Sequence, residues 1–447
     1  MRFADDVRRL VPLAWPVFVG QIAVMLFSTV DTLMLGQVSA QDLAALAVGS
    51  AAYVTVFVGL MGVVLAVAPL AGRHFGAGEH AAAGHTFVQA QWLGLLLCVP
   101  GCLVLWWPEP FVWLAELNAA QAAKVRDYTR PEAFALPFAL LFTAFRGFAQ
   151  SVSRPKAVML LQVLGLLLKV PLNAVLVFGA GPVPALGVAG CGWATASAMT
   201  VQSVAAILLL RRDAAYLPFA IKPLHRSRPE LKALRALVKL GVPMGGSILV
   251  EVTGFTFMAF FIARLGDTAV AGHQIAVNLV AMMFMLALAQ ATAAGTLVAQ
   301  HLGAGEPEAA RRVGRHALVL ATLVAGVVGA LAALLRQPIV ALYTRDQAAA
   351  AAAVPLLLWV WFFHLGDALQ TVAAYVLRAY HVATLPMVIY VLALWGLGIG
   401  GGYWLAFGPV GAGAVGFWQA ATAGLMAAGA ALLALCVYVF RRSAIEA

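Results

Sequence analysis

The chain has 447 residues, a formal net charge of +10, and an apolar composition in which 63% of residues are hydrophobic and only 10% are charged. Soluble domains carry about 25% charged residues, so this chain has too few to cover a water-exposed surface of its size. The basic residues fall in short clusters between apolar runs, as they do in membrane loops, which argues against nucleic acid as a partner. Composition therefore predicts an all-α polytopic membrane protein.

Twelve apolar runs are each long enough for a membrane-spanning helix of about twenty residues. In the first half of the chain they are 10–36, 46–72, 87–107, 131–152, 156–179 and 186–210. In the second half they are 236–263, 269–299, 316–336, 350–379, 383–407 and 411–440. Six helices per half predict an N-terminal lobe over 1–210 and a C-terminal lobe over 236–447, joined by a linker at 211–235.

The second half of the chain repeats the first. The segment Leu10-Val-Pro-Leu-Ala-Trp-Pro16 reappears as Leu237-Val-Lys-Leu-Gly-Val-Pro243, and His74-Phe-Gly-Ala-Gly-Glu79 reappears as His301-Leu-Gly-Ala-Gly-Glu306. Both pairs are displaced by 227 residues, so the copies align without a gap. Because six helices per half is an even number, both halves enter the membrane in the same orientation. This predicts a parallel internal repeat, a common plan of secondary transporters with a site between the halves.

The distribution of Lys and Arg orients the predicted helices. With both termini in the cytoplasm, 21 of the 28 basic residues lie in inner segments, 6 lie in outer segments, and Lys169 lies within a span. Basic residues are enriched in cytoplasmic loops of membrane proteins. We therefore expect a multi-pass protein with cytoplasmic termini and a cytoplasmic linker.

Four ionisable residues fall inside predicted spans, where a charge is expensive and usually marks a functional site. Glu251 and Asp367 lie near mid-depth, whereas Asp31 and Lys169 lie toward the outer side. Asn173 follows Lys169 by about one helical turn. We expect Glu251 and Asp367 to meet in the second lobe and the other three to meet in the first. The repeat does not duplicate the acids, so the two lobes should hold different polar sites.

These polar residues also have plain structural interpretations. A buried acid can serve as a polar contact between helices. Lys169 can face outward and extend its ammonium to the outer head groups, instead of pairing with Asp31. Met and Phe at helical spacing are often ordinary packing or lipid-facing surface.

A candidate substrate cavity surrounds the acids of the second lobe. Its expected lining combines aromatic, thioether, amide and hydroxyl side chains on the seventh, eighth and tenth spans: Phe255, Met258, Gln274, Asn278, Met282, Met285, Gln370 and Thr371. Methionine side chains adapt to varied ligands, so such a lining suits bulky, lipophilic cations.

In the order and placement of its motifs, the sequence resembles the multidrug and toxic compound extrusion (MATE) family of cation antiporters. The matching segments are Val30-Asp31-Thr32, Gly76-Ala-Gly, Pro171-Leu-Asn173, Glu251-Val-Thr, Gly303-Ala-Gly and Gly366-Asp367-Ala. The resemblance covers the whole chain and is closest to the bacterial subgroup that uses sodium ions or protons. It implies two six-helix lobes that form a V, with a central drug cavity and cation-binding acids inside the lobes.

Carried over residue by residue, the resemblance implies a coupling site in each lobe. Glu251 and Asp367 match the second-lobe site, which would bind either a proton or, as a metal ion, sodium. Asp31 and Asn173 match the first-lobe site, and Thr195 is a looser match.

One position departs from the family pattern. Many relatives have a neutral polar residue, often Asn, where this chain has Lys169. A lysine paired with Asp31 takes the role of a sodium ion in the first lobe. This favours protons over sodium as the coupling ion, while sodium at Glu251 and Asp367 stays an open alternative.

The sequence favours a multidrug efflux antiporter that exports organic, mostly cationic compounds in exchange for protons or sodium ions across the bacterial inner membrane. We expect a functional monomer in contact with membrane lipids, and no cofactor. The alternative is a flippase for a lipid-linked saccharide. Such flippases tend to carry several cationic residues in the cavity, whereas here the buried charges are three acids and one lysine. An enzyme is disfavoured because the chain has no HExxH, GxSxG or phosphate-binding loop.

Overall fold

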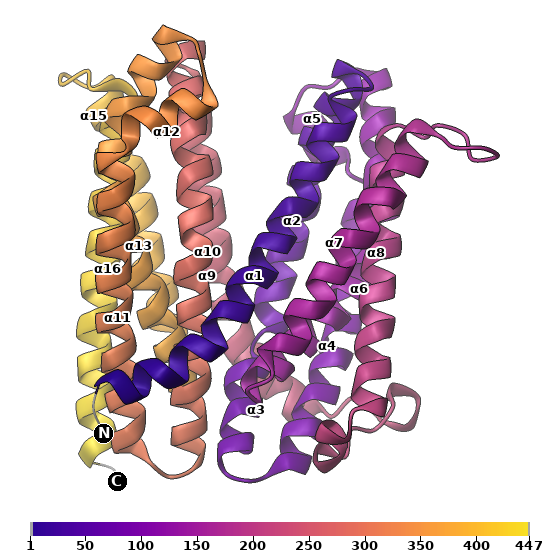
Figure 1. Ribbon diagram of the computed structural model, residues 1–447, viewed down its shortest axis with the longest axis vertical. Coiled ribbons are helices and arrows are strands. Elements are labelled where there is room, and N and C mark those ends of the chain that lie inside the picture. Colours follow the sequence, from indigo (N-terminus) through magenta and orange to yellow (C-terminus); the bar gives the residue numbers. More distant parts are fainter. Residues whose placement is uncertain (1–2, 446–447) are drawn as a thin grey trace. The chain divides into compact units, whose positions relative to one another are not determined.

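The computed structural model describes residues 3–445, which form an almost entirely helical protein (Figure 1). The first half contains α1 (Phe3–Leu35), α2 (Ala40–Val64), α3 (Val67–Gly76), α4 (His80–Trp106), α5 (Glu109–Leu114), α6 (Ala119–Ser151), α7 (Pro155–Phe178), α8 (Val188–Arg212) and the 3₁₀ turns η1 (Ala214–Phe219) and η2 (Leu224–Arg226). The second half contains α9 (Leu231–Ala263), α10 (Asp267–Gly303), α11 (Pro307–Leu334), α12 (Arg336–Tyr343), α13 (Gln347–Ala379), α14 (Thr384–Tyr390), the π-helical η3 (Val391–Gly400), α15 (Gly401–Phe407) and α16 (Gly413–Ile445).

Among the described residues, 12 helical segments are long and apolar enough to cross a membrane, which confirms the predicted number. Ten are single helices. The second span joins α2 to α3, and the eleventh joins α14, η3 and α15. A π-helical segment of ten residues is rare, and π-helical turns inside α-helices frequently accompany functional sites.

Several predicted spans begin too late. The sequence predicts the fourth span at 131–152, but α6 already begins at Ala119, where Asn118 and Gln121 form a capping box. The ninth span, predicted from residue 316, begins at Pro307. An apolar window detects only the part of a helix that faces hydrocarbon, so it misses polar and charged first turns. Consequently Glu132, at the edge of the predicted span, lies well inside α6.

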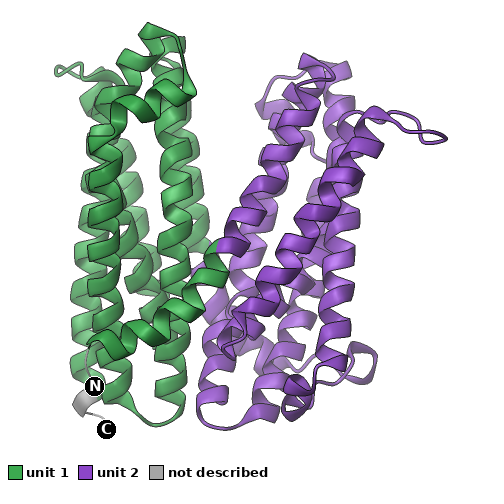
Figure 2. Ribbon diagram, viewed as in Figure 1, with its two compact units in different colours: residues 1–18, 246–447 green, residues 19–245 purple. Residues whose placement is uncertain are grey.

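The chain forms two compact units, each built from parts of both sequence halves (Figure 2). The N-terminal unit is Val19–Gly245, and the C-terminal unit is the chain from Gly246 onward with the N-terminal stretch through Phe18. Both divisions fall inside a helix, two residues after Pro16 in α1 and two residues after Pro243 in α9. These positions are equivalent in the repeat. The first half of α1 therefore belongs to the C-terminal unit, and the first half of α9 to the N-terminal unit.

A buried acid attaches the start of α1 to the C-terminal unit. Asp6 is fully buried, and its Oδ2 lies 2.6 Å from Nδ1 of His316 and 3.4 Å from Nε of Arg312, both on α11. One turn further along α1, Leu10 joins the main hydrophobic core of the same unit.

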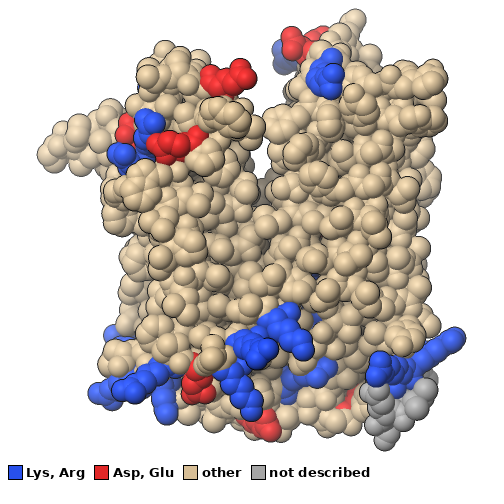
Figure 3. All heavy atoms as spheres, turned by 180° about the vertical axis from the view of Figure 1, so that it is seen from behind, with Lys and Arg blue, Asp and Glu red and all other residues tan. Residues whose placement is uncertain are grey.

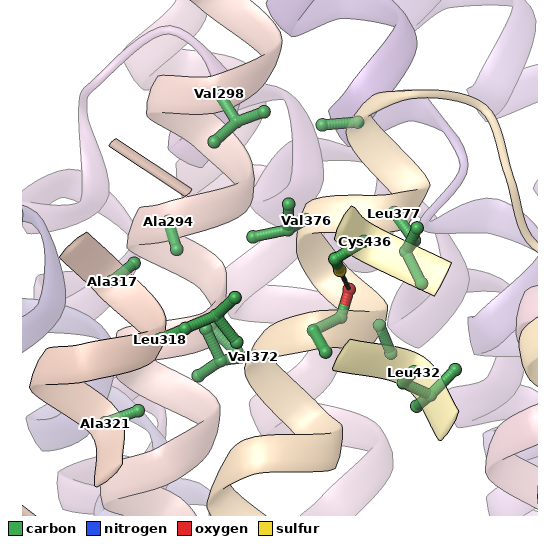
Figure 4. Packing of buried hydrophobic residues seen from close by; sticks show 14 of the residues in the cluster. Ala294, Val298, Ala317, Leu318, Ala321, Val372, Val376, Leu377, Leu432 and Cys436 are labelled. Carbon is green, nitrogen blue, oxygen red and sulfur yellow. Dashed lines mark hydrogen bonds between the residues drawn. The ribbon is translucent and has the colours of Figure 1, made fainter. Parts of the chain in front are cut away.

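Small side chains dominate that core. Figure 4 shows α10, α11, α13 and α16 packed through the residues Ala294, Val298, Ala317, Leu318, Ala321, Val372, Val376, Leu377, Leu432 and Cys436. The thiol of Cys436 donates to the carbonyl oxygen of Ala373 at 3.7 Å. Small residues let helices approach closely in hydrocarbon, where packing replaces the hydrophobic effect as the driving force. This packing fixes α13, the helix that carries Asp367.

The repeated motif His-x-Gly-Ala-Gly-Glu folds in the same way in both halves. In each copy, Nδ1 of the histidine lies 2.7 Å from Oε2 of the glutamate. Gly78 and Gly305 occupy equivalent positions with φ angles of 74° and 73°, in a region that residues with a Cβ atom rarely adopt. The internal repeat is therefore present in the structure as well as in the sequence.

The segment between the halves is bound along the N-terminal unit. Tyr216 and Phe219 of η1 are buried, and burial raises the pKa of Tyr216 to about 12. Further on, Gln89 of α4 donates to the carbonyl oxygen of Arg228 at 3.0 Å and accepts from the backbone nitrogen of Glu230 at 2.8 Å. The predicted linker is thus an ordered part of this unit.

Charged side chains gather at the ends of the spans. On the face drawn in Figure 3, most Lys and Arg side chains of each unit lie toward its lower end, and the middle of each unit carries almost no charge. An uncharged band is what a hydrocarbon environment requires. Its basic lower end matches the asymmetry that orients membrane proteins.

Candidate coupling sites

The C-terminal unit brings Glu251 and Asp367 to one amide group. Nε2 of Gln370 on α13 lies 3.2 Å from Oε1 of Glu251 on α9 and 3.1 Å from Oδ1 of Asp367, one turn earlier on α13. The same nitrogen lies 3.3 Å from Oγ1 of Thr371. The expected approach of the two acids is therefore observed, with Gln370 between them.

Neither acid of this site is ion-paired within the described residues, and the basic side chain that interacts electrostatically with Glu251 is the buried Arg378. Among the described residues, no Lys or Arg forms an ion pair with Glu251 or Asp367. Arg378, three turns beyond Asp367 on α13, is buried and lies over the ring of Tyr375, 4.5 Å from its centroid. Two neighbouring carboxylates repel each other when both are ionised, so a proton or a small cation taken up between them is stabilised.

A cavity of about 30 Å³ opens beside Glu251. Its other lining residues are Gly254, Phe255, Met258, Phe363, Leu394, Gly398, Ile399, Ala421 and Leu425. Three of these belong to the π-helical segment η3. The cavity has room for a water molecule or a small ion. It is far smaller than the pockets of about 300–1,000 Å³ that hold drug-sized ligands.

Four of the eight predicted cavity residues lie at this site. Phe255 and Met258 line the small cavity, and the rings of Phe255 and Phe363 meet edge to face with centroids 5.7 Å apart. Gln370 and Thr371 belong to the hydrogen-bonded group that holds the acids. Their predicted contact with a drug stays a prediction, because the cavity beside them is too small for one.

The other four predicted cavity residues all lie on α10. Nε2 of Gln274 donates to Oδ1 of Asn278 at 3.3 Å, and Gln274 is exposed. Met282 is 48% exposed, and Met285 is partly buried. They line neither the cavity at Glu251 nor the hydrogen-bonded group around Gln370. Their role in substrate binding also stays a prediction.

The N-terminal unit builds a different site around a buried ion pair. Nζ of Lys169 on α7 lies 2.8 Å from Oδ2 of Asp31 on α1 and 2.5 Å from Oγ1 of Thr195 on α8. Nδ2 of Asn173, one turn beyond Lys169, donates to Oδ1 of Asp31 at 2.6 Å. The structure thus brings together the four residues that the sequence assigns to this lobe.

Lys169 does not extend to the head groups, since it is only 1% exposed. Its ammonium lies 5.1 Å from the ring centroid of Phe27. The hydroxyl of Thr195 donates to the carbonyl of Cys191 at 3.0 Å, which leaves the oxygen lone pairs of Thr195 for the ammonium. Lys169 therefore provides the positive charge that balances Asp31.

Sequence reasoning missed one buried acid of this unit, Glu132 of α6, which is 0% exposed. Its carboxyl interacts electrostatically with Lys169 and Asp31 and lies beside the hydroxyls of Tyr128 and Thr195. Within the part of the chain that the structure describes, neither of its carboxyl oxygens has a hydrogen-bond partner. Among the described residues, the buried or partly buried acids well inside the spans are thus four, Asp31, Glu132, Glu251 and Asp367, rather than three. The sequence feature that could have identified Glu132 is an acid just inside a predicted span. Sequence reasoning overlooks it because the predicted span starts too late, which places Glu132 at its edge.

Two six-helix repeats, with a buried charged site in each unit, define a polytopic secondary transporter. The MatE family model matches residues 16–175 and again residues 243–404, and the two matches start at equivalent positions of the repeat. The chain therefore belongs to the MatE family.

Individual proteins agree with this assignment. The chain is 39% identical over 416 residues to the probable multidrug resistance protein NorM of Aromatoleum aromaticum, covering 92% of this chain and 90% of that one. It is 32% identical over 450 residues to the multidrug resistance protein PmpM of Pseudomonas aeruginosa, covering 99% and 92%. Among solved structures, the eukaryotic MATE transporter AtDTX14 matches with a TM-score of 0.88 at 19% identity, over 98% of each chain. At that identity the structural match supports the fold alone.

Proposed function

We propose that this protein exports lipophilic organic cations, including unrelated drugs, in exchange for protons. Membership of the MatE family and relatives named for multidrug resistance support export. The observation that carries the proposal is the pair of acids, Glu251 and Asp367, held together by Gln370 and without an ion pair to Lys or Arg among the described residues. Such a pair attracts a cation when it is ionised and releases it when it takes up protons.

The amide of Gln370 fits both protonation states of this pair. Its Nε2 donates to an oxygen of each carboxylate, as ionised acids require. Its Oε1 is buried and has no partner within the described residues. A protonated carboxyl carries an O–H donor, and this free Oε1 is the acceptor that such a donor needs. The site can therefore bind a proton without losing hydrogen bonds.

The N-terminal site favours protons over sodium as the coupling ion. Lys169 already neutralises Asp31, so a sodium ion there would meet the repulsion of a neighbouring ammonium. A proton can instead bind to Asp31 and break the ion pair, and Asn173 and Thr195 then remain as neutral partners. At Glu251 and Asp367, sodium remains the alternative ligand.

We also propose that the protein works as a monomer in the bacterial inner membrane, with both termini in the cytoplasm. The bacterial origin of the curated relatives supports this location. The excess of Lys and Arg on one side of the predicted spans supports the orientation.

Dye accumulation tests the proposed export. Cells that lack their own drug pumps and express this protein should hold less ethidium at steady state than cells with an empty vector, and an uncoupler should remove the difference. The variant Glu251→Gln, present in the membrane at the same level, is the matched negative control. Equal accumulation in expressing and empty-vector cells would contradict drug export and favour the lipid-linked saccharide flippase. Export that survives the uncoupler but needs external sodium would contradict proton coupling.

A further inference from the structure

Glu132 is a buried acid of α6 whose carboxyl has the hydroxyls of Tyr128 and Thr195 beside it but no partner at hydrogen-bond geometry among the described residues. It is completely buried in α6, and neither carboxyl oxygen accepts a hydrogen bond from any described residue. A polar group that serves only to join two helices is hydrogen-bonded, because a buried polar group without a partner is destabilising. Such a residue in a membrane span marks a functional site.

Polar groups from four neighbouring helices and from α6 itself surround this carboxyl. They are Asp31 of α1, Tyr53 of α2, Tyr128 of α6, Lys169 of α7, and Cys191 and Thr195 of α8. Cys102 of α4 donates instead to the backbone carbonyl of Ala133 at 3.1 Å. Helix α3 packs against α6 around Gly147, four turns away. Lys169 is therefore the one cation in this set, and it is shared by two acids.

The packing holds Glu132 against the Lys169 site. At Gly192 of α8, an added Cβ would lie 2.8 Å from the carbonyl oxygen of Tyr128 and 3.0 Å from Cβ of Pro131. Helix α8 therefore packs directly on the turn of α6 that carries Glu132. One turn further along α8, Thr195 lies beside the Glu132 carboxyl and 2.5 Å from the ammonium of Lys169. The hydroxyl of Thr195 thus lies beside both the Glu132 carboxyl and the Lys169 ammonium.

We propose that Glu132 is a second proton-binding carboxyl of the N-terminal site, and that Asp31 and Glu132 alternate as the partner of Lys169. In the structure Lys169 is paired with Asp31. Glu132 is then the neutral acid, because a second buried carboxylate would have no cation of its own. When Asp31 takes up a proton, its ion pair breaks and the ammonium turns to Glu132. Glu132 then releases its proton and becomes the carboxylate partner. One proton enters Asp31 as one leaves Glu132, so the site has a net charge of zero in both paired states, and neither state leaves an unpaired charge in hydrocarbon.

This inference rests on the proposed proton coupling and adds a residue to it. It requires that Lys169 can be satisfied by either acid. Replacing Asp31 or Glu132 alone therefore leaves the ammonium with one carboxylate. Replacing both leaves it buried with none, which is the most costly arrangement.

A double-mutant cycle of thermal unfolding in detergent tests the shared partner. Asp31→Asn and Glu132→Gln should each lower the unfolding midpoint moderately, and the double variant should fall by clearly more than the two shifts added. Asp31→Asn combined with Glu116→Gln is the matched control, because Glu116 is an exposed acid of the same unit. The shifts of the unfolding midpoint caused by these two substitutions should simply add. If the double variant does not fold, adding Lys169→Asn should restore folding, since no unpaired ammonium remains.

Transport assays separate this inference from the function on which it rests. In proteoliposomes, Glu132→Gln should slow proton-driven export at least about tenfold and flatten its dependence on pH, without changing drug affinity. A structural role would not move the pH profile. Additive shifts in the cycle together with a wild-type pH profile for Glu132→Gln would overturn the role of Glu132 and leave the proposed function intact. A wild-type protein that ignores a pH gradient would overturn proton coupling itself.

Discussion

In the C-terminal unit, Glu251 and Asp367 share one amide and form no ion pair with any described Lys or Arg, whereas in the N-terminal unit Asp31 is ion-paired with Lys169. The two units descend from one repeat, yet the repeat places Val24 opposite Glu251. A buried pair of acids without an ion-paired lysine is stabilised when it takes up a proton or a small cation. An acid paired with a lysine is already neutral, so only a proton that breaks the pair can change its state.

The repeat is nevertheless preserved where it shapes the backbone. The two His-x-Gly-Ala-Gly-Glu loops have the same His–Glu contact and the same glycine conformation. The divisions between the compact units also fall at equivalent positions in α1 and α9. The comparison shows that the duplicated scaffold constrains loops and helix breaks, while the side chains within the spans have diverged into two kinds of site.

The largest effect on export should come from substitutions in the C-terminal site, at Glu251 and Asp367. Glu251→Gln and Asp367→Asn should each reduce ethidium export to the level of the empty vector, because a neutral amide cannot exchange a proton for a drug. Export is measured in intact cells at matched membrane levels of the protein. Glu308→Gln is the control. Glu308 lies on the same unit and its side chain is 87% exposed, so the variant should export ethidium normally. Wild-type export by either site variant would remove that residue from the coupling site.

The N-terminal pair should respond as a unit. Lys169→Asn should lower the free energy of unfolding by about 3–5 kcal/mol, because it leaves Asp31 buried without its cation. Adding Asp31→Asn should recover most of this loss. The measurement is denaturation of the purified variants followed by intrinsic fluorescence. Losses that add across the double variant would mean that the two charges do not stabilise each other.

Removing the lysine should also make the N-terminal site resemble the C-terminal one. In Lys169→Asn, the oxygen atoms of Asp31, Asn173 and Thr195 are left as ligands for a hard cation. We expect sodium, but not choline, to stabilise this variant, by about 2.7 kcal/mol at a concentration 100 times its dissociation constant. The N-terminal site with Lys169 intact should show no such gain. The comparison protein is therefore Glu251→Gln, in which Lys169 is intact and the C-terminal site is disabled. Identical sodium responses with and without Lys169 would contradict the idea that the lysine replaces a cation.

The smallest effect on stability should come from the two repeated loops, and it should be equal in both units. Gly78→Ala and Gly305→Ala each force a residue with a Cβ atom into the left-handed region, at a cost of about 1–2 kcal/mol. Nothing lies within 4 Å of an added Cβ at either position, so backbone strain is the whole effect. Unfolding midpoints of the two variants should agree. Clearly unequal shifts would show that the two loops differ in ways that their backbones do not reveal.

The sequence predicts the number of spans because a membrane helix must be apolar over its whole hydrocarbon-facing length. It also predicts that Asp31, Lys169 and Asn173 meet, since their distances from the helix ends place them at one depth. It misses Glu132, because the predicted span starts at residue 131 and this acid therefore looks like a polar helix end, whereas α6 already begins at Ala119. It names Gln370 as a cavity residue, which stays a prediction, but it does not predict that Gln370 lies between the two acids, a contact that depends on how α9 packs on α13.

The composition of the two units could not be predicted from the sequence either. A run of apolar residues shows that a helix lies in an apolar environment. It does not show against which unit each half of a long helix packs. Asp6 and Leu10 pack with α11 and the core of the C-terminal unit, although they open the N-terminal half of the chain. That assignment is made by tertiary contacts alone.

The most direct test of the account is transport by the purified protein in proteoliposomes, with a pH gradient and a sodium gradient imposed separately. We predict that the pH gradient alone drives uptake of a fluorescent organic cation into the vesicles, and that Glu251→Gln and Asp367→Asn abolish this uptake. The sodium gradient alone should drive none. Uptake driven by sodium at uniform pH, and unchanged by a pH gradient, would contradict the proton exchange that we assign to these two sites.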